Sequence, residues 1–541
     1  MPVRPGLNTG YQYYLIDIDA NGVEKPDADG VGGLLSQRVV NLVRDQHTTD
    51  LFLCAHGWGQ DLAAAAPKYD EWVGLMVSQG LQSQDADRQR LAWGDVEQAR
   101  AEDPGYRSAA VALHWPSDAL DNEMADTLAA APFARGSGLA TSDPAARDAL
   151  AARLAAPIPG GEQTRDAIKQ IMDSADQIAA SRSDAVGLLD GRLPDHLQAA
   201  YQALYDASGI AGTAPGATPR PDFGPVVKKS VRLAAYASAR QSAARPSPSR
   251  HGIVGEIEDA LADIEGAAKV LLTELRGAFQ GADAIADKVW GVALLAVAQL
   301  SFWSMKERAR QVGAKFGHQF LNDLLTASQD LRIHLMGHSF GCILASASVC
   351  GPVQGDGAEC ALDRHQVGAV YLVQGAMSVW SYSEHFPFDV AEAGYFWPAQ
   401  RRVRGPLVTT QSRWDKANGF WYPLATTLES PDVIPATAGH GILRRPATAG
   451  ATTSDLLDYG AAVGTHGLLN TDPAASPLPA MKQASDLPQP EYGLRPARIY
   501  NMDASAVICD QSNPWMGAHS DIMHPEVAEL YWQAVLAAIR P

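Results

Sequence analysis

The sequence of 541 residues has few cysteines and lacks any long apolar run. Five cysteines without a Cys-x-x-Cys pair indicate neither a disulfide framework nor a zinc ribbon. The longest apolar run, residues 289–298, is too short to span a bilayer, and residues 1–10 contain no apolar segment typical of a signal peptide. We therefore expect no transmembrane segment, and a protein that is cytoplasmic or is exported without a cleaved signal peptide.

Positive charge is also scarce, because 43 basic residues face 61 acidic ones and the formal net charge is −18. This balance argues against nucleic-acid binding, which needs basic surface to neutralise phosphates. The chain has neither a Gly-Lys-Ser/Thr phosphate loop nor a Gly-x-Gly-x-x-Gly turn at a strand end, so nucleotide binding is not expected. The length predicts two domains, or one core with a large insertion.

Short apolar runs typical of strands occur near both ends of the chain and alternate with helical stretches. They cover residues 11–19, 50–55, 109–115, 331–337, 367–373, 406–411 and 498–502. Nearly continuous apolar strands separated by helices are typical of a parallel sheet that is covered on both faces. The pattern predicts an α/β fold with a mostly parallel central sheet flanked by helices.

The middle of the chain has no strand pattern. It contains Ala-rich helical stretches, for example residues 163–181, 189–207, 226–244 and 257–279. We expect a large helical insertion at residues 119–319 within a discontinuous core of residues 1–118 and 320–541. The apolar stretch 289–303 predicts either a buried core helix or a lid over an apolar pocket. Residues 427–496 are rich in Pro, Gly, Ala and Thr and are expected to form loops.

A serine motif follows the fourth predicted strand. Residues 331–341, LRIHLMGHSFG, place Ser339 in a Gly-x-Ser-x-Gly pattern between an apolar strand and a helix start of small residues. In such a motif the serine sits on a sharp, strained turn that lifts its hydroxyl above the sheet. A buried turn with an inert serine is the plainer interpretation. The context favours Ser339 as a nucleophile.

A serine nucleophile needs a base, and the base needs an orienting acid. Asp415 lies in the loop after the strand 406–411 and is the preferred acid, although a solvated loop aspartate is the alternative. His519 lies in the loop before the last helix and is the preferred base. His524 directly precedes Pro525, which suits the first helical position, so His524 is the reserve candidate.

An oxyanion hole would require backbone N–H donors near the serine. One donor is expected from the amide of Phe340, directly after Ser339. The second is expected from the turn His56-Gly57-Trp58-Gly59, which follows the strand 50–55, with Trp58 or Gly57 as the donor. The alternative for this turn is a plain glycine-rich connection.

Four segments together resemble the α/β-hydrolase superfamily. They are AHGWG (55–59), LMGHSFG (335–341), TTQSRWDKA (409–417) and GAHSDI (517–522), and they place Ser339, Asp415 and His519 in the order of that superfamily. The resemblance covers roughly residues 10–118 and 320–541. It implies an esterase- or lipase-like serine hydrolase with a Ser-His-Asp catalytic triad that uses neither a cofactor nor a metal. One departure is that the large insertion precedes the nucleophile strand, whereas familiar cap domains often enter after a later strand.

We therefore expect hydrolysis of a small-molecule or lipid carboxylic ester through an acyl-enzyme intermediate. An amidase, a thioesterase or a phospholipase-type lipid hydrolase on the same three residues is the catalytic alternative. A non-catalytic scaffold that binds partners through the helical insertion is the alternative from another class of protein.

Overall fold

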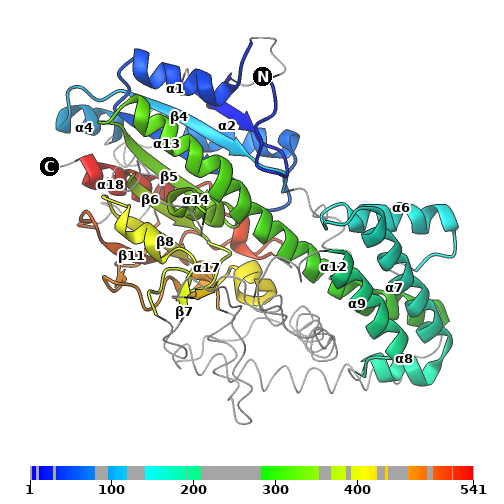
Figure 1. Ribbon diagram of the computed structural model, residues 1–541. Helices are drawn as coiled ribbons and strands as arrows, with labels where there is room; N and C mark the ends of the chain where they lie inside the picture. The colour runs from blue at the N-terminus through cyan, green and yellow to red at the C-terminus, as the bar shows by residue number, and fades with distance from the viewer. Residues whose placement is uncertain are drawn as a thin grey trace.

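The computed structural model of the chain describes most of the predicted core and part of the predicted insertion. The described residues are 3–7, 11–27, 32–78, 95–117, 140–189, 192–208, 282–352, 367–385, 392–422, 433–435, 461–483, 492–513 and 516–539. Figure 1 shows a body built around a sheet and, to one side of it, a smaller group of helices. The predicted helices 226–244 and 257–279 lie outside the described residues.

One sheet of nine strands forms the centre of the body, in the order β1-β2-β4-β3-β5-β6-β8-β11-β10. Only β1 and β2 pair antiparallel, and all other neighbours are parallel. The predicted α/β class with a mostly parallel sheet is therefore confirmed. The strands are β1 (Val3–Pro5), β2 (Gln12–Asp17), β3 (Asp50–Ala55), β4 (Ser108–His114), β5 (Arg332–His338), β6 (Val367–Val373), β8 (Leu407–Gln411), β10 (Ser476–Pro477) and β11 (Ile499–Asp503), and a separate pair consists of β7 (Glu392–Gly394) and β9 (Val433–Pro435).

The central strands are buried along their whole length, which explains their continuous apolar sequence. Every residue of β3 and of β6 is buried, because helices cover both faces of the sheet. For these two strands the predicted and observed bounds agree, and the other predicted strands differ by one or two residues at their ends. The strands β1 and β10 were not predicted, because runs of three and two residues carry no periodic pattern.

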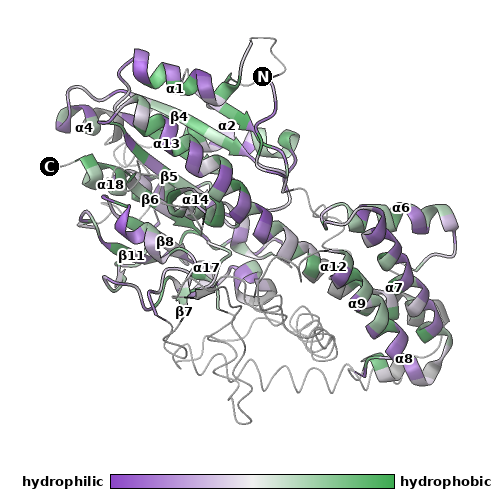
Figure 2. Ribbon diagram, in the orientation of Figure 1, coloured by the Kyte–Doolittle hydropathy of each residue, from purple (hydrophilic) through white to green (hydrophobic). Residues whose placement is uncertain are grey.

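Two layers of helices enclose the sheet. The helices α1, α13, α14 and the second half of α12 pack on one face, and α2, α4 and α18 pack on the other. In Figure 2 the strands are mostly green, whereas a covering helix such as α1 carries both colours, as expected for a helix with one buried side. The helices of these layers are α1 (Leu35–Asp45), α2 (Leu62–Ser78), α4 (Asp95–Glu102), α12 (Ala282–Val312), α13 (His318–Ala327), α14 (Gly341–Cys350) and α18 (Pro525–Ile539).

Short helical turns occupy the connections near the ends of the strands. They are the π-helical turns η2 (Gly313–Gly317) and η5 (Ala417–Trp421), the 3-10 turns η4 (Trp397–Arg401) and η7 (Ala518–Ser520), and the short helix α17 (Val463–His466). Two of them, η5 and η7, lie in the segments that directly follow β8 or precede α18, where the acid and the base were predicted. The helix α17 lies within residues 427–496, which were expected to form loops.

The smaller group of helices forms a core of its own, separate from the sheet. It consists of α6 (Pro144–Ala155), α7 (Glu162–Ala180), α8 (Arg182–Leu189), α9 (Asp195–Ala207) and the first half of α12. In α7 the buried side chains recur at intervals of three or four residues, at Ile168, Ile171, Met172, Ala175 and Ile178. The helical nature of the middle of the chain thus holds for the residues that are described there.

The long helix α12 belongs to both bodies, and in Figure 1 it runs from the sheet to the group of helices. Its residues from Val289 to Leu300 pack in the core of the helical group, whereas those from Phe302 to Val312 pack against the helices of the sheet. The boundary between the core of the helical group and the core of the sheet therefore lies inside one continuous helix, between Leu300 and Phe302. It comes before the expected boundary at residues 319 and 320. A continuous helix has no break in its sequence pattern, so its change of partner leaves no local signal.

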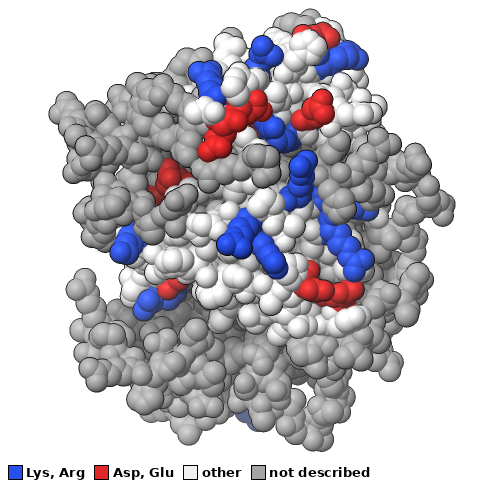
Figure 3. All heavy atoms as spheres, turned by 90° about the vertical axis from the view of Figure 1, so that its left-hand side faces the viewer, with Lys and Arg blue, Asp and Glu red and all other residues white. Residues whose placement is uncertain are grey.

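On the face shown in Figure 3, basic and acidic side chains of the described residues are interspersed among uncharged ones. Ion pairs such as Arg332 with Asp103, at 2.9 Å, join charges of opposite sign. None of the helices described here is long and apolar enough to cross a membrane.

Candidate active site

The carboxyl ends of the strands β3, β5, β8 and β11 bear the four segments that were singled out in the sequence. From β3 the chain continues to its neighbour β4 on one side, and from β5 it continues to β6 on the other side, so the order of the strands along the chain reverses between β3 and β5. The helices that follow these two strands, α2 and α14, pack on opposite faces of the sheet. Parallel sheets place their ligands in the crevice beyond the carboxyl ends of the strands at such a reversal. The topology thus brings the predicted site residues to the usual ligand-binding edge.

Ser339 stands in a strained turn between β5 and α14. Its φ is 56°, in the left-handed region that non-glycine residues rarely adopt. Hydrogen bonds hold this conformation, because the Ser339 amide donates to the Val373 carbonyl (3.1 Å) and the Ser339 carbonyl accepts from the amides of Cys342 (3.1 Å) and Ala376 (3.3 Å). A Cβ atom on Gly341 would lie 2.1 Å from the Ala55 carbonyl oxygen, so the glycine lets α14 begin directly against the end of β3.

Ser339, His519 and Asp415 lie together. The His519 Nε2 atom is 2.8 Å from the Ser339 hydroxyl oxygen, and the His519 Nδ1 atom is 2.8 Å from Asp415 Oδ2. All three side chains are buried. Because a carboxylate can only accept, the hydrogen of a neutral His519 is placed on Nδ1, and Nε2 then accepts from the Ser339 hydroxyl.

His524, the reserve candidate for the base, lies elsewhere. Its Nε2 atom is 2.7 Å from Asp521 Oδ1, and its carbonyl accepts from the amides of Val527 (3.1 Å) and Ala528 (3.2 Å) at the start of α18. His524 is therefore committed to the start of this helix, and of the two candidate histidines it is His519 that contacts the serine.

The turn that follows β8 holds the Asp415 carboxylate with a residue that the sequence reasoning missed. Asn418 donates its backbone N–H to Asp415 Oδ1 (2.9 Å) and its side-chain Nδ2–H to Asp415 Oδ2 (2.7 Å). An aspartate that accepts from the amide three residues later is a familiar pattern where a helical turn begins. An aspartate just before the helical residues 417–421, with Asn418 three positions after it, was therefore a signal that could have been used.

A second histidine supports His519 from the serine motif itself. His338 Nε2 lies 2.9 Å from the His519 carbonyl oxygen, and the two rings are 5.1 Å apart. Complete burial, together with the nearby His519, lowers the pKa of His338 to about 3. His338 is therefore neutral at neutral pH and can donate to the carbonyl without placing a second positive charge beside His519.

In the loop after β3, a histidine ring fixes the direction of one peptide unit. His56 Nδ1 lies 2.7 Å from the Gly57 carbonyl oxygen, and burial followed by the proximity of His114 lowers the pKa of His56 to about 3. A neutral His56 that donates from Nδ1 fixes the direction of the Gly57 carbonyl. Because a trans peptide is planar, the N–H of Trp58 in the same peptide unit points the opposite way, away from the His56 ring.

The residues that were expected to supply the oxyanion donors lie near one another and near Ser339. The rings of Trp58 and Phe340 are 6.0 Å apart, and a Cβ atom on Gly57 would lie only 2.7 Å from the Ser339 Cβ. The amide of Gly59 is already used, because it donates to the Ser117 carbonyl (2.8 Å). Within the described ranges, the amides of Gly57, Trp58 and Phe340 have no acceptor.

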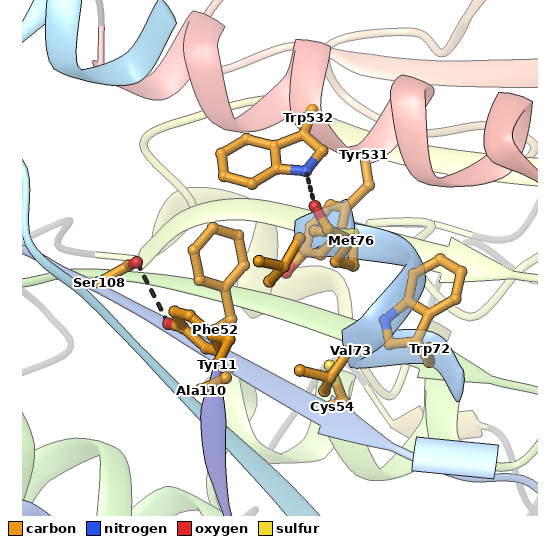
Figure 4. A pocket seen from close by; sticks show the side chains of 11 residues that line it. Tyr11, Phe52, Cys54, Trp72, Val73, Met76, Ser108, Ala110, Tyr531 and Trp532 are labelled. Carbon is orange, nitrogen blue, oxygen red and sulfur yellow. Dashed lines mark hydrogen bonds between the residues drawn. The ribbon is translucent and has the colours of Figure 1, made fainter. Parts of the chain in front are cut away.

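A cavity of about 30 Å³, drawn in Figure 4, lies apart from this group. It opens between the sheet and the helices α2 and α18, where Phe52, Met76 and Trp532 line it. A water molecule needs roughly 10–15 Å³ on this scale, so the cavity has the volume of about two waters and is too small for an ester. It is a packing defect of the core on that face of the sheet.

No protein family, curated protein or solved structure was found to match this chain. The described residues also contain no group of His, Cys, Asp and Glu side chains that could hold a metal ion.

Proposed function

We propose that this chain is a serine hydrolase of the α/β-hydrolase fold that cleaves carboxylic esters through an acyl-enzyme intermediate. The observation that carries the proposal is Ser339, on its left-handed turn, 2.8 Å from the Nε2 of a histidine whose Nδ1 is 2.8 Å from a buried carboxylate. A serine that is a poor nucleophile at neutral pH becomes reactive when an oriented base can take its proton.

In the first step the Ser339 Oγ attacks the acyl carbonyl carbon, and its proton passes to His519 Nε2. Asp415 keeps the Nδ1 hydrogen in place and stabilises the imidazolium that forms, without itself accepting the proton. His338 remains neutral beside it, because its pKa is about 3. The His519 imidazolium is thus the one positively charged ring of the two histidines in this step.

The carbonyl oxygen becomes an oxyanion in the tetrahedral intermediate. We assign its stabilisation to the backbone N–H groups of Phe340 and Trp58, with that of Gly57 as the neighbouring alternative. Donors that are fixed before the reaction need no reorganisation when the charge develops, and each is worth about 10²- to 10³-fold in rate. The His56 contact to the Gly57 carbonyl, at 2.7 Å, supports this direction of the Trp58 amide.

The intermediate collapses when the His519 imidazolium returns its proton to the alcohol oxygen, so that the C–O bond breaks and the alcohol leaves. A water molecule then gives a proton to His519 and attacks the acyl carbon on Ser339. The second tetrahedral intermediate releases the carboxylic acid, and the proton on His519 returns to the serine oxygen. The cycle consumes one ester and one water and restores the three side chains.

The helical group and α12 are proposed as a cap over this site. Phe302, on α12, packs against both residues assigned as oxyanion donors, with ring distances of 5.8 Å to Trp58 and 4.9 Å to Phe340. One turn further, Lys306 donates to the hydroxyl of Tyr422 (2.7 Å), at the end of the turn that begins beside Asp415. The helix that enters the helical group thereby also forms a wall of the proposed site.

Active-site labelling tests the proposal directly. A fluorophosphonate probe should label the wild-type chain, and the labelled peptide should contain Ser339, whereas Ser339→Ala should be neither labelled nor active toward p-nitrophenyl acetate. A folded wild-type chain that is not labelled would favour the non-catalytic scaffold. Hydrolysis by Ser339→Ala at the wild-type rate would exclude Ser339 as the nucleophile. Comparison of matched esters, thioesters, anilides and phospholipids of increasing chain length then identifies the substrate class.

A further inference from the structure

Resting on this proposed function, we infer that Asn418 is a positioning residue for the reaction. Its side chain holds the Asp415 carboxylate against His519 and joins the turn of the acid to the segment after β6, which makes hydrogen bonds with the backbone of Ser339. No substrate contact is assigned to it. Asn418 is completely buried, so water does not compete for its hydrogen bonds.

The hydrogen bonds define the orientation of the Asn418 amide. Its Nδ2 atom donates to Asp415 Oδ2 (2.7 Å) and to the Gln374 carbonyl oxygen (2.8 Å). Both partners are acceptors, so the NH₂ group must face them and both of its hydrogens are used. The same Nδ2 lies 3.3 Å from His519 Nδ1, which carries its own hydrogen toward Asp415. This third contact is therefore close packing rather than a hydrogen bond.

The Asp415 carboxylate depends on this residue, because two of its three recorded donors belong to Asn418. The backbone N–H serves Oδ1, and the side chain shares Oδ2 with His519. A buried carboxylate is stable only when donors replace the lost water. The side-chain bond also prevents rotation of the carboxylate, and rotation would turn Oδ2 away from the His519 Nδ1–H.

The second hydrogen bond connects the acid to the serine. Gln374 follows the last residue of β6, Val373, whose carbonyl accepts from the amide of Ser339 at 3.1 Å. Two residues after Gln374, the amide of Ala376 donates to the Ser339 carbonyl. The Asn418 amide thus spans from the carboxylate to the segment that fixes the strained serine, and it sets the distance between the two ends of the Ser339–His519–Asp415 chain.

A neighbouring glycine offers a second way to disturb this amide. A Cβ atom on Gly464, in α17, would lie 2.1 Å from Asn418 Nδ2. The same Cβ would lie 2.8 Å from the backbone carbon of Gln374, so both partners of the hydrogen bond would have to move. Gly464→Ala therefore displaces the Asn418 side chain without removing it.

Asn418→Ala, Asn418→Asp and Gly464→Ala should share one kinetic defect. We expect kcat for p-nitrophenyl acetate and the rate of fluorophosphonate labelling to fall about 10- to 100-fold in Asn418→Ala, with KM little changed, because the ground-state contacts of the ester do not involve Asn418. Asn418→Asp keeps the shape but replaces the donor by a second carboxylate next to Asp415. The kcat of Asn418→Asp should therefore be lower than that of Asn418→Ala. If Asn418 only filled space, Asn418→Asp, which keeps the shape, would instead retain more activity than Asn418→Ala.

The matched control is Asn501→Ala. Asn501 makes three side-chain hydrogen bonds, to Thr409 and to the backbone of Leu468, and none of them involves Ser339, His519 or Asp415. This variant should lower the thermal midpoint as much as Asn418→Ala does, while kcat stays near that of the wild type. Equal loss of kcat in both variants would show that Asn418 has only a structural role.

A spectroscopic measurement separates this inference from the proposed function. The downfield proton resonance of His519 Nδ1–H, identified by its absence in His519→Gln, should shift or broaden in Asn418→Ala and in Gly464→Ala but not in Asn501→Ala. A wild-type chain without labelling or hydrolysis would refute the proposed function, whatever this resonance does. An active wild type whose kcat and Nδ1–H resonance are both unchanged by Asn418→Ala and Asn418→Asp would refute the positioning role alone.

Discussion

At the amino ends of the parallel strands (the amino edge of the sheet) and at their carboxyl ends (the carboxyl edge), a buried histidine lies beside a buried aspartate. Only the pair at the carboxyl edge faces a serine. At the amino edge, His334 Nε2 lies 2.9 Å from Asp50 Oδ1. At the carboxyl edge, His519 Nδ1 lies 2.8 Å from Asp415 Oδ2. The distances are nearly equal, so the difference between the pairs lies in their surroundings.

The pair at the amino edge is fully occupied. The Asp50 carboxylate also accepts two hydrogen bonds from Arg332, at 2.8 and 2.6 Å, and one from Thr49, at 2.6 Å. The second ring nitrogen of His334 accepts from the amide of Ala369 (3.1 Å). Both residues sit in strands, and no nitrogen of the histidine is left for another partner.

The pair at the carboxyl edge lies in turns, and the second nitrogen of its histidine is directed at Ser339. A His–Asp contact is therefore not by itself a sign of catalysis. The distinguishing features are a ring nitrogen that contacts a hydroxyl, a serine held at a φ of 56°, and amides nearby that have no acceptor in the described chain. Making the same Asp→Asn mutation in each pair therefore separates a catalytic role from a structural one.

The largest effect is expected from Asp415→Asn, which should lower kcat for p-nitrophenyl acetate by about 10³- to 10⁴-fold. Oδ1 faces the Asn418 amide, and Oδ2 faces both the Asn418 side chain and His519. In either orientation, the NH₂ group of an asparagine would thus oppose a donor or force His519 into the tautomer that cannot accept from the serine. Steady-state kinetics on a folded variant, checked by circular dichroism, measures the loss. Retention of a tenth or more of the wild-type kcat would contradict the assignment of the acid.

The same replacement at the amino edge, Asp50→Asn, should act on stability. Removing the charge from a buried pair leaves Arg332 and His334 without their carboxylate and costs about 3 kcal/mol of unfolding free energy. Urea denaturation of the wild type and the variant measures this difference. Hydrolysis at a temperature where the variant is folded should be unchanged, and a selective loss of kcat would mean that the two edges are not independent.

A pH titration should show the third effect, again at Asp50. Burial raises the pKa of this carboxyl, but the hydrogen bonds from His334, Arg332 and Thr49 outweigh it and lower the pKa from 3.8 to about 2. Because the folded-state pKa is the lower one, the stabilisation is complete above pH 4 and is lost as the pH falls toward 2, by up to about 2 kcal/mol. The unfolding free energy should therefore fall more steeply between about pH 4 and pH 2 in the wild type than in Asp50→Asn. Parallel curves would contradict this shift.

The smallest effect is expected from His56→Phe, at the carboxyl edge. Phenylalanine keeps a ring that can stack on Trp115 but loses the hydrogen bond to the Gly57 carbonyl. The direction of the Trp58 amide is then less well defined, and kcat should fall about tenfold, which corresponds to about 1.4 kcal/mol of barrier. Kinetics with substrates of increasing leaving-group ability provide the measurement. An unchanged kcat for all of them would remove His56 from the support of the oxyanion donors.

Local patterns were sufficient for the seven predicted strands, although not for the shortest ones, and for the strand ends at which the site residues lie. A strand that is buried on both faces must be apolar along its length, so residues 50–55 and 367–373 were predicted with the bounds that they have in the structure. Since the carboxyl ends of parallel strands share one edge, Ser339, Asp415 and His519 could be expected together, and the structure places them within hydrogen-bonding distance. Their roles in hydrolysis stay a prediction until Ser339 is labelled.

The tertiary structure alone decided which distant residues meet. Asp50 and His334 are 284 positions apart, and nothing in the local sequence of either residue signals that β3 and β5 are neighbours. The order of the strands also brings Gln374 beside Asn418 and His338 beneath the His519 carbonyl. Local sequence patterns thus predicted the longer strands and the residues available at their ends, because these depend on interactions over a few residues. The hydrogen bonds that separate a structural pair from a reactive one depend on the packing of the whole sheet, so they appear only in the folded chain.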